Sequence, residues 1–148
     1  MEISKETLLG MYRKMLTIRR FEERGAELYA AGRMPGFVHL YVGEEAVATG
    51  VCASLSDKDF ITSTHRGHGH VIAKGGKTDL MMAELYGKVT GFCKGRAGSV
   101  HLHDFQLGIL GANGIIGANL VITSGAAMSA QMRGTKQVAV AFFGDGVV

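Results

Sequence analysis

Apolar residues near the N-terminus recur at intervals of three and four, which is the spacing of one face of an α-helix. The members of this stripe are Leu8, Met11, Tyr12, Met15, Leu16, Ile18 and Phe21. Ser4 is a suitable N-cap, because its hydroxyl can accept from the first turn, and Gly32 is a suitable stop. The pattern predicts a long amphipathic helix that ends near residues 29–31.

The rest of the chain alternates helical and strand-like segments. Small-residue or amphipathic patterns predict helices over 44–55, 78–87 and 119–133, and apolar runs predict strands over 59–62 and 137–143. Residues 87–117 contain eight glycines but also several apolar side chains, which predicts an ordered loop lining a site. This alternation predicts an α/β fold.

Length and composition narrow the class of protein. The chain has 148 residues, of which 47% are hydrophobic and 20% charged, as expected for one soluble globular domain over 1–148. Its longest apolar runs are too short to span a bilayer, and its charged N-terminus shows no export signal. Cys52 and Cys93 are isolated, so we expect buried, reduced thiols and a cytoplasmic protein.

The charge pattern bears on the ligand. The formal net charge is +3, and the basic residues are scattered without a basic run or interleaved aromatics. This pattern argues against nucleic-acid binding and favours an anionic small molecule.

The last predicted strand is followed by Gly144, Asp145 and Gly146. In open α/β sheets, ligands bind beyond the carboxyl ends of the strands. A carboxylate between two glycines is well placed there to hold Mg²⁺, with backbone free to approach a phosphate. An ordinary Asp-Gly turn is the alternative interpretation.

Five of the six histidines lie in two clusters. They are His65, His68 and His70, then His101 and His103. Imidazoles can bind zinc, copper or nickel, but Gly67 and Gly69 predict a flexible backbone here and not a helix that would place two ligands on one face, and no nearby Cys or carboxylate completes a ligand set. Hydrogen-bonded structural histidines are a further alternative. Arg66, which directly follows a strand end, instead suggests phosphate recognition.

Five segments together resemble one family. They are 36–46 (GFVHLYVGEEA), 64–69 (THRGHG), 94–101 (KGRAGSVH), 114–117 (GIIG) and 144–146 (GDG). In this order they resemble the alpha subunit of the thiamine-diphosphate-dependent dehydrogenases that act on pyruvate, branched-chain 2-oxoacids and acetoin. Histidine at position 65, where pyruvate enzymes usually have tyrosine, looks most like the acetoin dehydrogenase branch. The implied fold is a thiamine-diphosphate-binding fold, a parallel sheet flanked by helices with a long leading helix. Residues 1–148 would form the N-terminal part of this single domain, with no second domain.

The resemblance also implies roles for individual residues. His65 and Arg66 match the pair that contacts the diphosphate, and Asp145, flanked by Gly144 and Gly146, matches a Mg²⁺ ligand. Gly114 matches a backbone acceptor for the aminopyrimidine, and Ile116 matches the side chain that bends the cofactor. His39 matches a substrate-contacting histidine, and His68 is a further catalytic candidate for that pocket.

The implied enzyme is an acetoin dehydrogenase that cleaves acetoin and passes an acetyl unit to lipoamide. Its implied partners are a beta subunit, in an α2β2 heterotetramer, and a lipoyl acyltransferase. The family motif continues past the last residue here to an Asn-Asn pair that completes the Mg²⁺ site, so we expect these 148 residues alone to bind cofactor weakly and to be inactive. Alternatives are a pyruvate or branched-chain 2-oxoacid dehydrogenase, a non-catalytic interaction module, and a metal-binding protein built on the histidine cluster.

Overall fold

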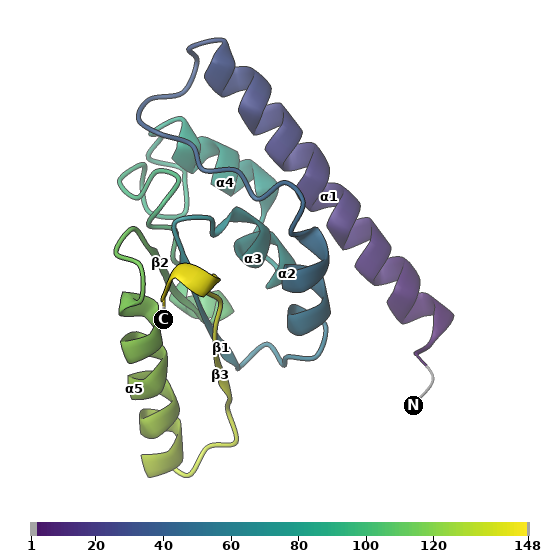
Figure 1. Cartoon of the computed structure of the whole chain (residues 1–148), viewed down its shortest axis with the longest axis vertical. Coiled ribbons are helices and arrows are strands. Elements are labelled where there is room, and N and C mark those ends of the chain that lie inside the picture. The colour runs from purple at the N-terminus through teal and green to yellow at the C-terminus, as the bar shows by residue number, and fades with distance from the viewer. Residues whose placement is uncertain (1–2, 148) are drawn as a thin grey trace.

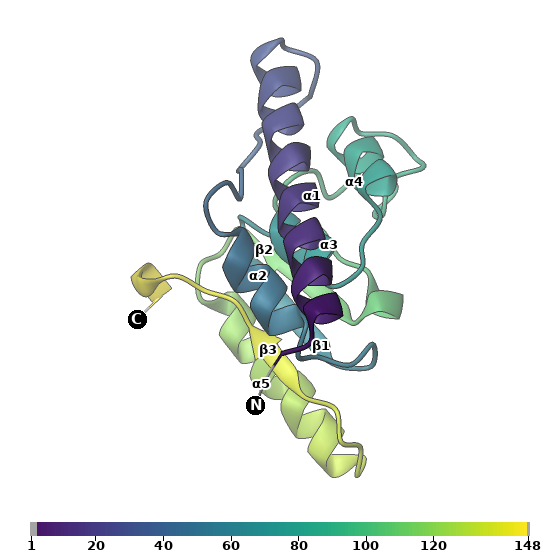
Figure 2. The ribbon, with the colours of Figure 1, turned by 90° about the vertical axis from the view of Figure 1, so that its right-hand side faces the viewer.

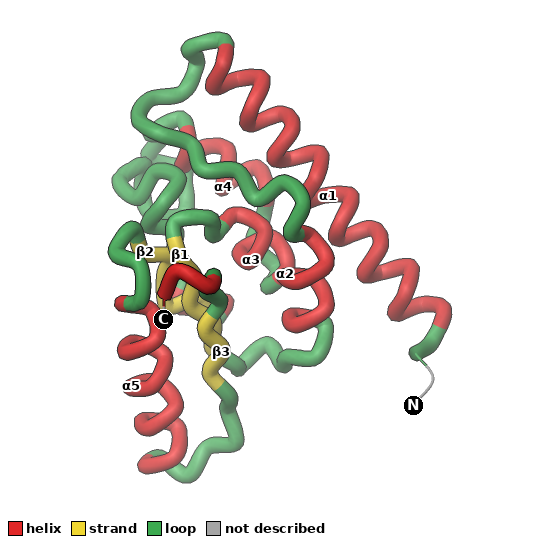
Figure 3. The backbone as a smooth tube through the Cα atoms, viewed as in Figure 1, coloured by secondary structure: helices red, strands yellow, loops and turns green. Residues whose placement is uncertain are grey.

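The structure is a computed structural model that describes residues 3–147. Its helices are α1 (Lys5–Ala30), α2 (Glu45–Cys52), α3 (His68–Ala73), α4 (Thr78–Leu85) and α5 (Ala118–Met132). Its strands are β1 (Phe60–Thr64), β2 (Ile109–Asn113) and β3 (Ala139–Ala141), and two short 3-10 turns are η1 (Phe105–Leu107) and η2 (Asp145–Val147). Figure 3 shows how much of the chain between these elements is loop.

The three strands form a parallel sheet in the order β2-β1-β3. The α/β class is therefore confirmed. Helix α5 contacts all three strands, while α1, α2 and α3 pack against one another. Figure 1 shows the sheet between α5 on one side and α2 and α3 on the other, with α1 outermost. In Figure 2 the C-terminal ends of α1 and α5 form opposite ends of the molecule.

The predicted helices over 44–55, 78–87 and 119–133 are present, each with slightly different bounds. The predicted strand over 137–143 is shorter and less buried than expected, because Val138 and Phe143 are each about half exposed. Helix α3 and strand β2 were not predicted. Cys52 is buried and Cys93 half-buried, and both thiols are free.

Helix α1 has the predicted length, and its N-cap Ser4 accepts from the Thr7 amide at 3.1 Å. The predicted apolar stripe is only partly right. Ile18 and Phe21 are buried, but Leu8 and Tyr12 are about half exposed. The buried face lies instead along the C-terminal half of the helix: Ile18, Phe21, Glu22, Gly25 and Leu28.

Helix α3 depends on glycine for close packing, which is why the expectation of a flexible backbone at Gly67 and Gly69 was wrong. A Cβ at Gly69 would overlap the ring of Tyr41. A Cβ at Gly67 would lie 2.9 Å from the Cβ of Ala112, on β2. The glycines are needed here because neighbouring elements occupy the space of a side chain.

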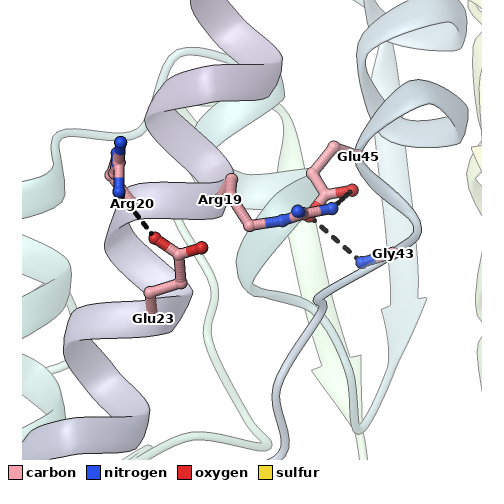
Figure 4. Close-up of polar contacts among 5 residues, drawn as sticks. All are labelled: Arg19, Arg20, Glu23, Gly43 and Glu45. Atoms are coloured by element: carbon pink, nitrogen blue, oxygen red, sulfur yellow. Dashed lines mark hydrogen bonds and ion pairs between the residues drawn. The ribbon is translucent and has the colours of Figure 1, made fainter.

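A charged contact joins α1 to the start of α2. Arg19 donates from Nε to Oε1 of Glu45 at 2.6 Å and from Nη2 to Oε2 at 3.1 Å (Figure 4). The Gly43 amide also donates to Glu45, at 3.1 Å. Glu45 is buried, whereas the Arg19 side chain is 42% exposed. Figure 4 also shows the exposed pair Arg20–Glu23 on the same helix.

We expect this contact to make the fold sensitive to acid. The hydrogen bond from Arg19 lowers the pKa of Glu45 from 4.5 to about 2. A depressed carboxyl pKa stabilises the fold above the unfolded value and loses that contribution as the pH falls from about 4.5 toward about 2. Glu45→Gln should lower the free energy of unfolding by about 1–2 kcal/mol at pH 7, since the partly exposed arginine weakens the pair.

Urea unfolding at several pH values measures this difference, which should shrink to roughly half or less by pH 3. Glu27→Gln, in the exposed pair with Arg24, is the matched control and should cost under about 0.5 kcal/mol. A Glu45→Gln deficit that stays constant from pH 7 to pH 3 would contradict the assignment.

In the part of the chain that the structure describes, no helix combines the length and the apolar character needed to cross a membrane.

Candidate functional site

The predicted cofactor residues follow the carboxyl ends of all three strands. His65 and Arg66 come directly after β1, Gly114 and Ile116 after β2, and the 144–146 turn after β3. Because parallel strands end at the same edge of a sheet, the fold brings these three segments to one side of the molecule. The 114–117 and 144–147 segments also meet, since a Cβ on Gly117 would lie 3.7 Å from the side chain of Val147. Figure 1 shows η2, in yellow, next to the start of α5.

A cavity of about 250 Å³ lies between the ends of β1 and β3. Three predicted site residues, His65, Arg66 and Gly144, line it together. The loop before α2 and α2 itself contribute Tyr41, Glu44 and Val47 to its lining. The other lining residues are Thr64 on β1, His70 on α3, and Phe142 and Phe143 after β3. The cavity combines a guanidinium and an imidazole with exposed backbone at Gly144, as an anionic ligand requires.

His39 and His65 pack edge to face, with ring centroids 5.2 Å apart and an interplanar angle of 88°. The Nδ1 atom of each ring is buried and has no hydrogen-bond partner among residues 3–147. Buried polar atoms normally have partners, so two orphaned nitrogens on adjoining rings indicate a place where a ligand completes the hydrogen bonding.

The imidazole of His39 is held in its neutral form. Burial lowers its pKa below 6.5, and the neighbouring His65, Arg66 and His68 lower it further. A neutral imidazole carries one N–H donor and one acceptor nitrogen near pH 7, so it can either accept or give a proton.

Arg66 is oriented by the backbone. Its Nη1 donates to the carbonyl of Leu40 at 2.7 Å, and the side chain is otherwise exposed toward the cavity.

Tyr41, which follows Leu40 in the sequence, is held by a contact of 2.9 Å between its hydroxyl and Nε2 of His70. Nδ1 of His70 in turn lies 2.7 Å from the Ser63 hydroxyl. Burial lowers the pKa of His70 to about 3, so the His70 ring that connects Tyr41 to Ser63 carries no charge at neutral pH.

His68 lies in the interior, not on the cavity. Its side chain is completely buried, and both ring nitrogens have protein partners. Nδ1 contacts the Glu22 carboxyl at 2.9 and 3.2 Å, and Nε2 contacts the Ser99 hydroxyl at 2.9 Å. Ser99 also accepts from the His39 amide at 3.0 Å. This arrangement favours a supporting role for His68 over direct contact with substrate.

The remaining predicted residues are open to solvent. Ile116 is 45% exposed and Asp145 is exposed. His101 lies near Gly114, 3.6 Å from a Cβ built there, but it lines a different cavity with His103. Among the described residues, no group of three His, Cys, Asp or Glu side chains is arranged to hold a metal ion. The histidine cluster at 65–70 therefore does not form the metal site considered as an alternative, and Asp145 provides a single carboxylate.

The glycine-rich segment after α4 is ordered by one buried carboxylate. Oε2 of Glu84 accepts from the amides of Cys93 and Gly95, each at 2.8 Å. Oε1 accepts from the amides of Ala97 and Gly98 at 2.7 and 3.3 Å. Glu84 is completely buried. The loop that carries Ser99 is thus fixed to α4 by four hydrogen bonds to a single side chain.

Several residues that shape the site were not predicted from the sequence. Glu22, Tyr41, Glu84 and Ser99 received no role from the sequence, although Tyr41 and Ser99 lie in the segments 36–46 and 94–101 that resemble the family. A further signal was present at Glu22, which occupies the same helical face as Ile18 and Gly25. A charged residue on the buried face of a helix needs a partner, and here that partner is His68.

The chain is similar to known proteins along nearly all its length. A family model described as the dehydrogenase E1 component matches residues 13–147. The chain is 58% identical over 146 residues, 99% of its length, to the alpha subunit of acetoin:2,6-dichlorophenolindophenol oxidoreductase from Bacillus subtilis (strain 168). It is 54% identical over 97% of its length to the protein of the same name from Cupriavidus necator, and 43% identical over 98% to the pyruvate dehydrogenase E1 component subunit alpha of Rhizobium meliloti (strain 1021). It covers 44%, 43% and 42% of these three relatives, so it spans less than half of their length.

Proposed function

Since this chain belongs to the dehydrogenase E1 component family, we propose that it forms the cofactor-binding N-terminal part of the alpha subunit of a thiamine-diphosphate-dependent acetoin dehydrogenase. Higher identity to the two acetoin oxidoreductase subunits, 58% and 54% against 43% for a pyruvate dehydrogenase subunit, supports acetoin over pyruvate. His65, beside Arg66, supports the same branch. A pyruvate or branched-chain 2-oxoacid dehydrogenase is the alternative within this family.

The residues present fit thiamine diphosphate. The observation that carries the proposal is the edge of the sheet where Arg66 and Gly144 line one cavity and the Nδ1 atom of His65 lacks a partner. His65 and Arg66 would bind the diphosphate, because a guanidinium and an imidazole offer several N–H donors to phosphate oxygens. When bound, thiamine diphosphate supplies the nucleophilic carbon for cleavage of a carbon–carbon bond in the substrate.

The turn after β3 would hold Mg²⁺ through Asp145, with Gly144 and Gly146 giving the phosphate access to the backbone. Mg²⁺ takes six oxygen ligands, so Asp145 supplies one of several. The Gly114 carbonyl would accept from the aminopyrimidine, and the exposed side chain of Ile116 would pack against it.

His39 would act on the substrate. Its neutral ring lies against His65, and its unpartnered Nδ1 is available to accept a proton or a hydrogen bond from a substrate oxygen. His68, although a catalytic candidate by resemblance, would support His39 from the interior.

The complete protein would work with a beta subunit in an α2β2 assembly and pass an acetyl unit to lipoamide on a lipoyl acyltransferase. The alpha-subunit names of the relatives support a beta partner. The proposal keeps the cytoplasmic location predicted from the sequence. An interaction module without catalysis is less well supported, because His65 lines the cavity with Arg66 and Gly144 and its buried Nδ1 has no partner among the described residues.

A dye-reduction assay tests this function. The full-length protein, mixed with its beta subunit, thiamine diphosphate and Mg²⁺, should reduce 2,6-dichlorophenolindophenol with acetoin at a kcat/KM at least about tenfold above that with pyruvate, a difference of about 1.4 kcal/mol in activation free energy. Equal or greater activity with pyruvate would move the assignment to the alternative branch. No activity with acetoin, pyruvate or branched-chain 2-oxoacids would remove the proposed function.

A further inference from the structure

We infer that Glu22, His68 and Ser99 form a buried relay of positioning residues that holds His39 in the site. This inference rests on the proposed function, because it assigns His39 its working geometry. The relay runs from α1 through the first residue of α3 and the loop at 94–101 to the segment between α1 and α2. Four parts of the chain that are distant in sequence therefore meet in one line of hydrogen bonds.

The direction of the hydrogen bonds can be followed from the His39 amide to the Glu22 carboxyl. The His39 amide can only donate, so Ser99 Oγ accepts from it at 3.0 Å. Among the described residues, the other partner of Ser99 is Nε2 of His68, at 2.9 Å. If the Ser99 hydroxyl donates to that nitrogen, Nδ1 of His68 carries the proton and donates to the Glu22 carboxyl at 2.9 Å. In this arrangement every polar atom on the path is satisfied.

Burial makes the relay rigid. Glu22 and His68 are completely buried, and Ser99 is 4% exposed. Phe21 packs edge-on against the His68 ring, with centroids 6.0 Å apart and an interplanar angle of 85°. Hydrogen bonds away from water are stronger, and leaving a member unpaired costs more. None of the three side chains contacts the cavity, so they act through the backbone of His39 and not on the ligand.

Holding the His39 amide fixes the backbone position from which its side chain extends. The His39 ring touches His65 and leaves Nδ1 without a partner. A residue in an irregular segment would otherwise sample several backbone conformations, and a misplaced catalytic group loses much of its effect. The relay thus explains how a loop residue keeps the geometry that a catalytic group needs.

Ser99→Ala tests the relay in the full-length protein assembled with its beta subunit. The variant removes one hydroxyl from a buried position and leaves the volume nearly unchanged. Hydrogen exchange at the His39 amide, resolved by mass spectrometry, should accelerate at least tenfold. Turnover should fall at least tenfold, while affinity for thiamine diphosphate stays within twofold. Ser99→Thr keeps the hydroxyl and should restore both slow exchange and turnover.

Three further variants complete the experiment. Ser124→Ala removes an exposed serine hydroxyl on α5, which bonds only the Leu120 carbonyl of its own helix, and should change neither readout. Glu22→Gln keeps an acceptor for His68 and should stay close to the unmodified protein, whereas Glu22→Leu should behave like Ser99→Ala. Unchanged His39 exchange in Ser99→Ala would overturn the inference, and so would faster exchange with full turnover. If the unmodified protein shows no turnover, the proposed function fails, and the exchange data alone decide whether the relay holds His39.

Discussion

Glu84→Gln should destabilise the fold more than Glu45→Gln. The Glu84 carboxylate is completely buried and accepts from four backbone amides of the 93–98 segment. Glutamine replaces one acceptor oxygen with an NH₂ group, which would face two amide donors and leave them unsatisfied. Since each unsatisfied buried donor costs about 1–3 kcal/mol, we expect a loss of about 3 kcal/mol or more in the free energy of unfolding.

Urea unfolding at pH 7 measures this loss. Glu23→Gln provides the matched control, because Glu23 lies on α1 in an exposed pair with Arg20 and should cost no more than about 0.5 kcal/mol. A deficit under about 1 kcal/mol for Glu84→Gln would show that the loop is held by other contacts.

Arg66→Ala should have the largest effect on ligand binding. In the proposed function, Arg66 presents its guanidinium to the diphosphate while the Leu40 carbonyl holds one of its nitrogens at 2.7 Å. Charge-assisted hydrogen bonds to phosphate are among the stronger polar interactions in proteins. Losing them should weaken thiamine diphosphate binding by about 2–3 kcal/mol, or roughly 30- to 150-fold.

Calorimetric titration of the full-length protein with thiamine diphosphate and Mg²⁺ measures this affinity. Arg133→Ala, which removes an exposed arginine at the end of α5, controls for the loss of one positive charge. The same affinity in Arg66→Ala and Arg133→Ala would remove Arg66 from the diphosphate site.

The sequence predicted those elements whose signals are local. Helix α1 has an N-cap at Ser4, helical periodicity and a glycine stop, and its bounds match. The prediction could not tell which of its apolar residues are buried, because periodicity defines a face but not the neighbour that covers it. Leu8 and Tyr12 continue the pattern of Ile18 and Phe21 but extend past the elements that cover the later turns.

Elements that depend on tertiary contact were missed. Helix α3 contains Gly69, which lowers helix propensity, yet the Tyr41 ring occupies the space where a side chain would be. Strand β2 lies in a glycine-rich segment and contains Gly111, so its local pattern resembles a loop. It forms a strand because β1 pairs with it in parallel at Ile109 and, after a register shift, from Gly111 to Asn113.

In the candidate site, too, residues in local motifs were predicted and those that depend on tertiary contacts were not. Motif residues such as His65, Arg66 and Asp145 were identified by resemblance to a family, and parallel strand ends explain why the fold gathers them at one edge. The supporting roles of Glu22, His68 and Ser99 could not be predicted from the sequence, because their partners are far away along the chain. Glu22 and His68 are separated by 46 positions and Ser99 and His39 by 60, and only the folded structure brings them together.

The order of the strands has a consequence for biosynthesis. The central strand β1 is made first, yet its neighbours come from much later in the chain; the contact between Asp59 and the amide of Val138 spans 79 positions. A nascent chain that has reached β2 already carries His39, His65 and Arg66 but has no partner on the other side of β1. The cavity between β1 and β3 closes only when β3 docks. A ligand that binds there recognises only molecules in which β3 has docked, and it raises their stability by mass action.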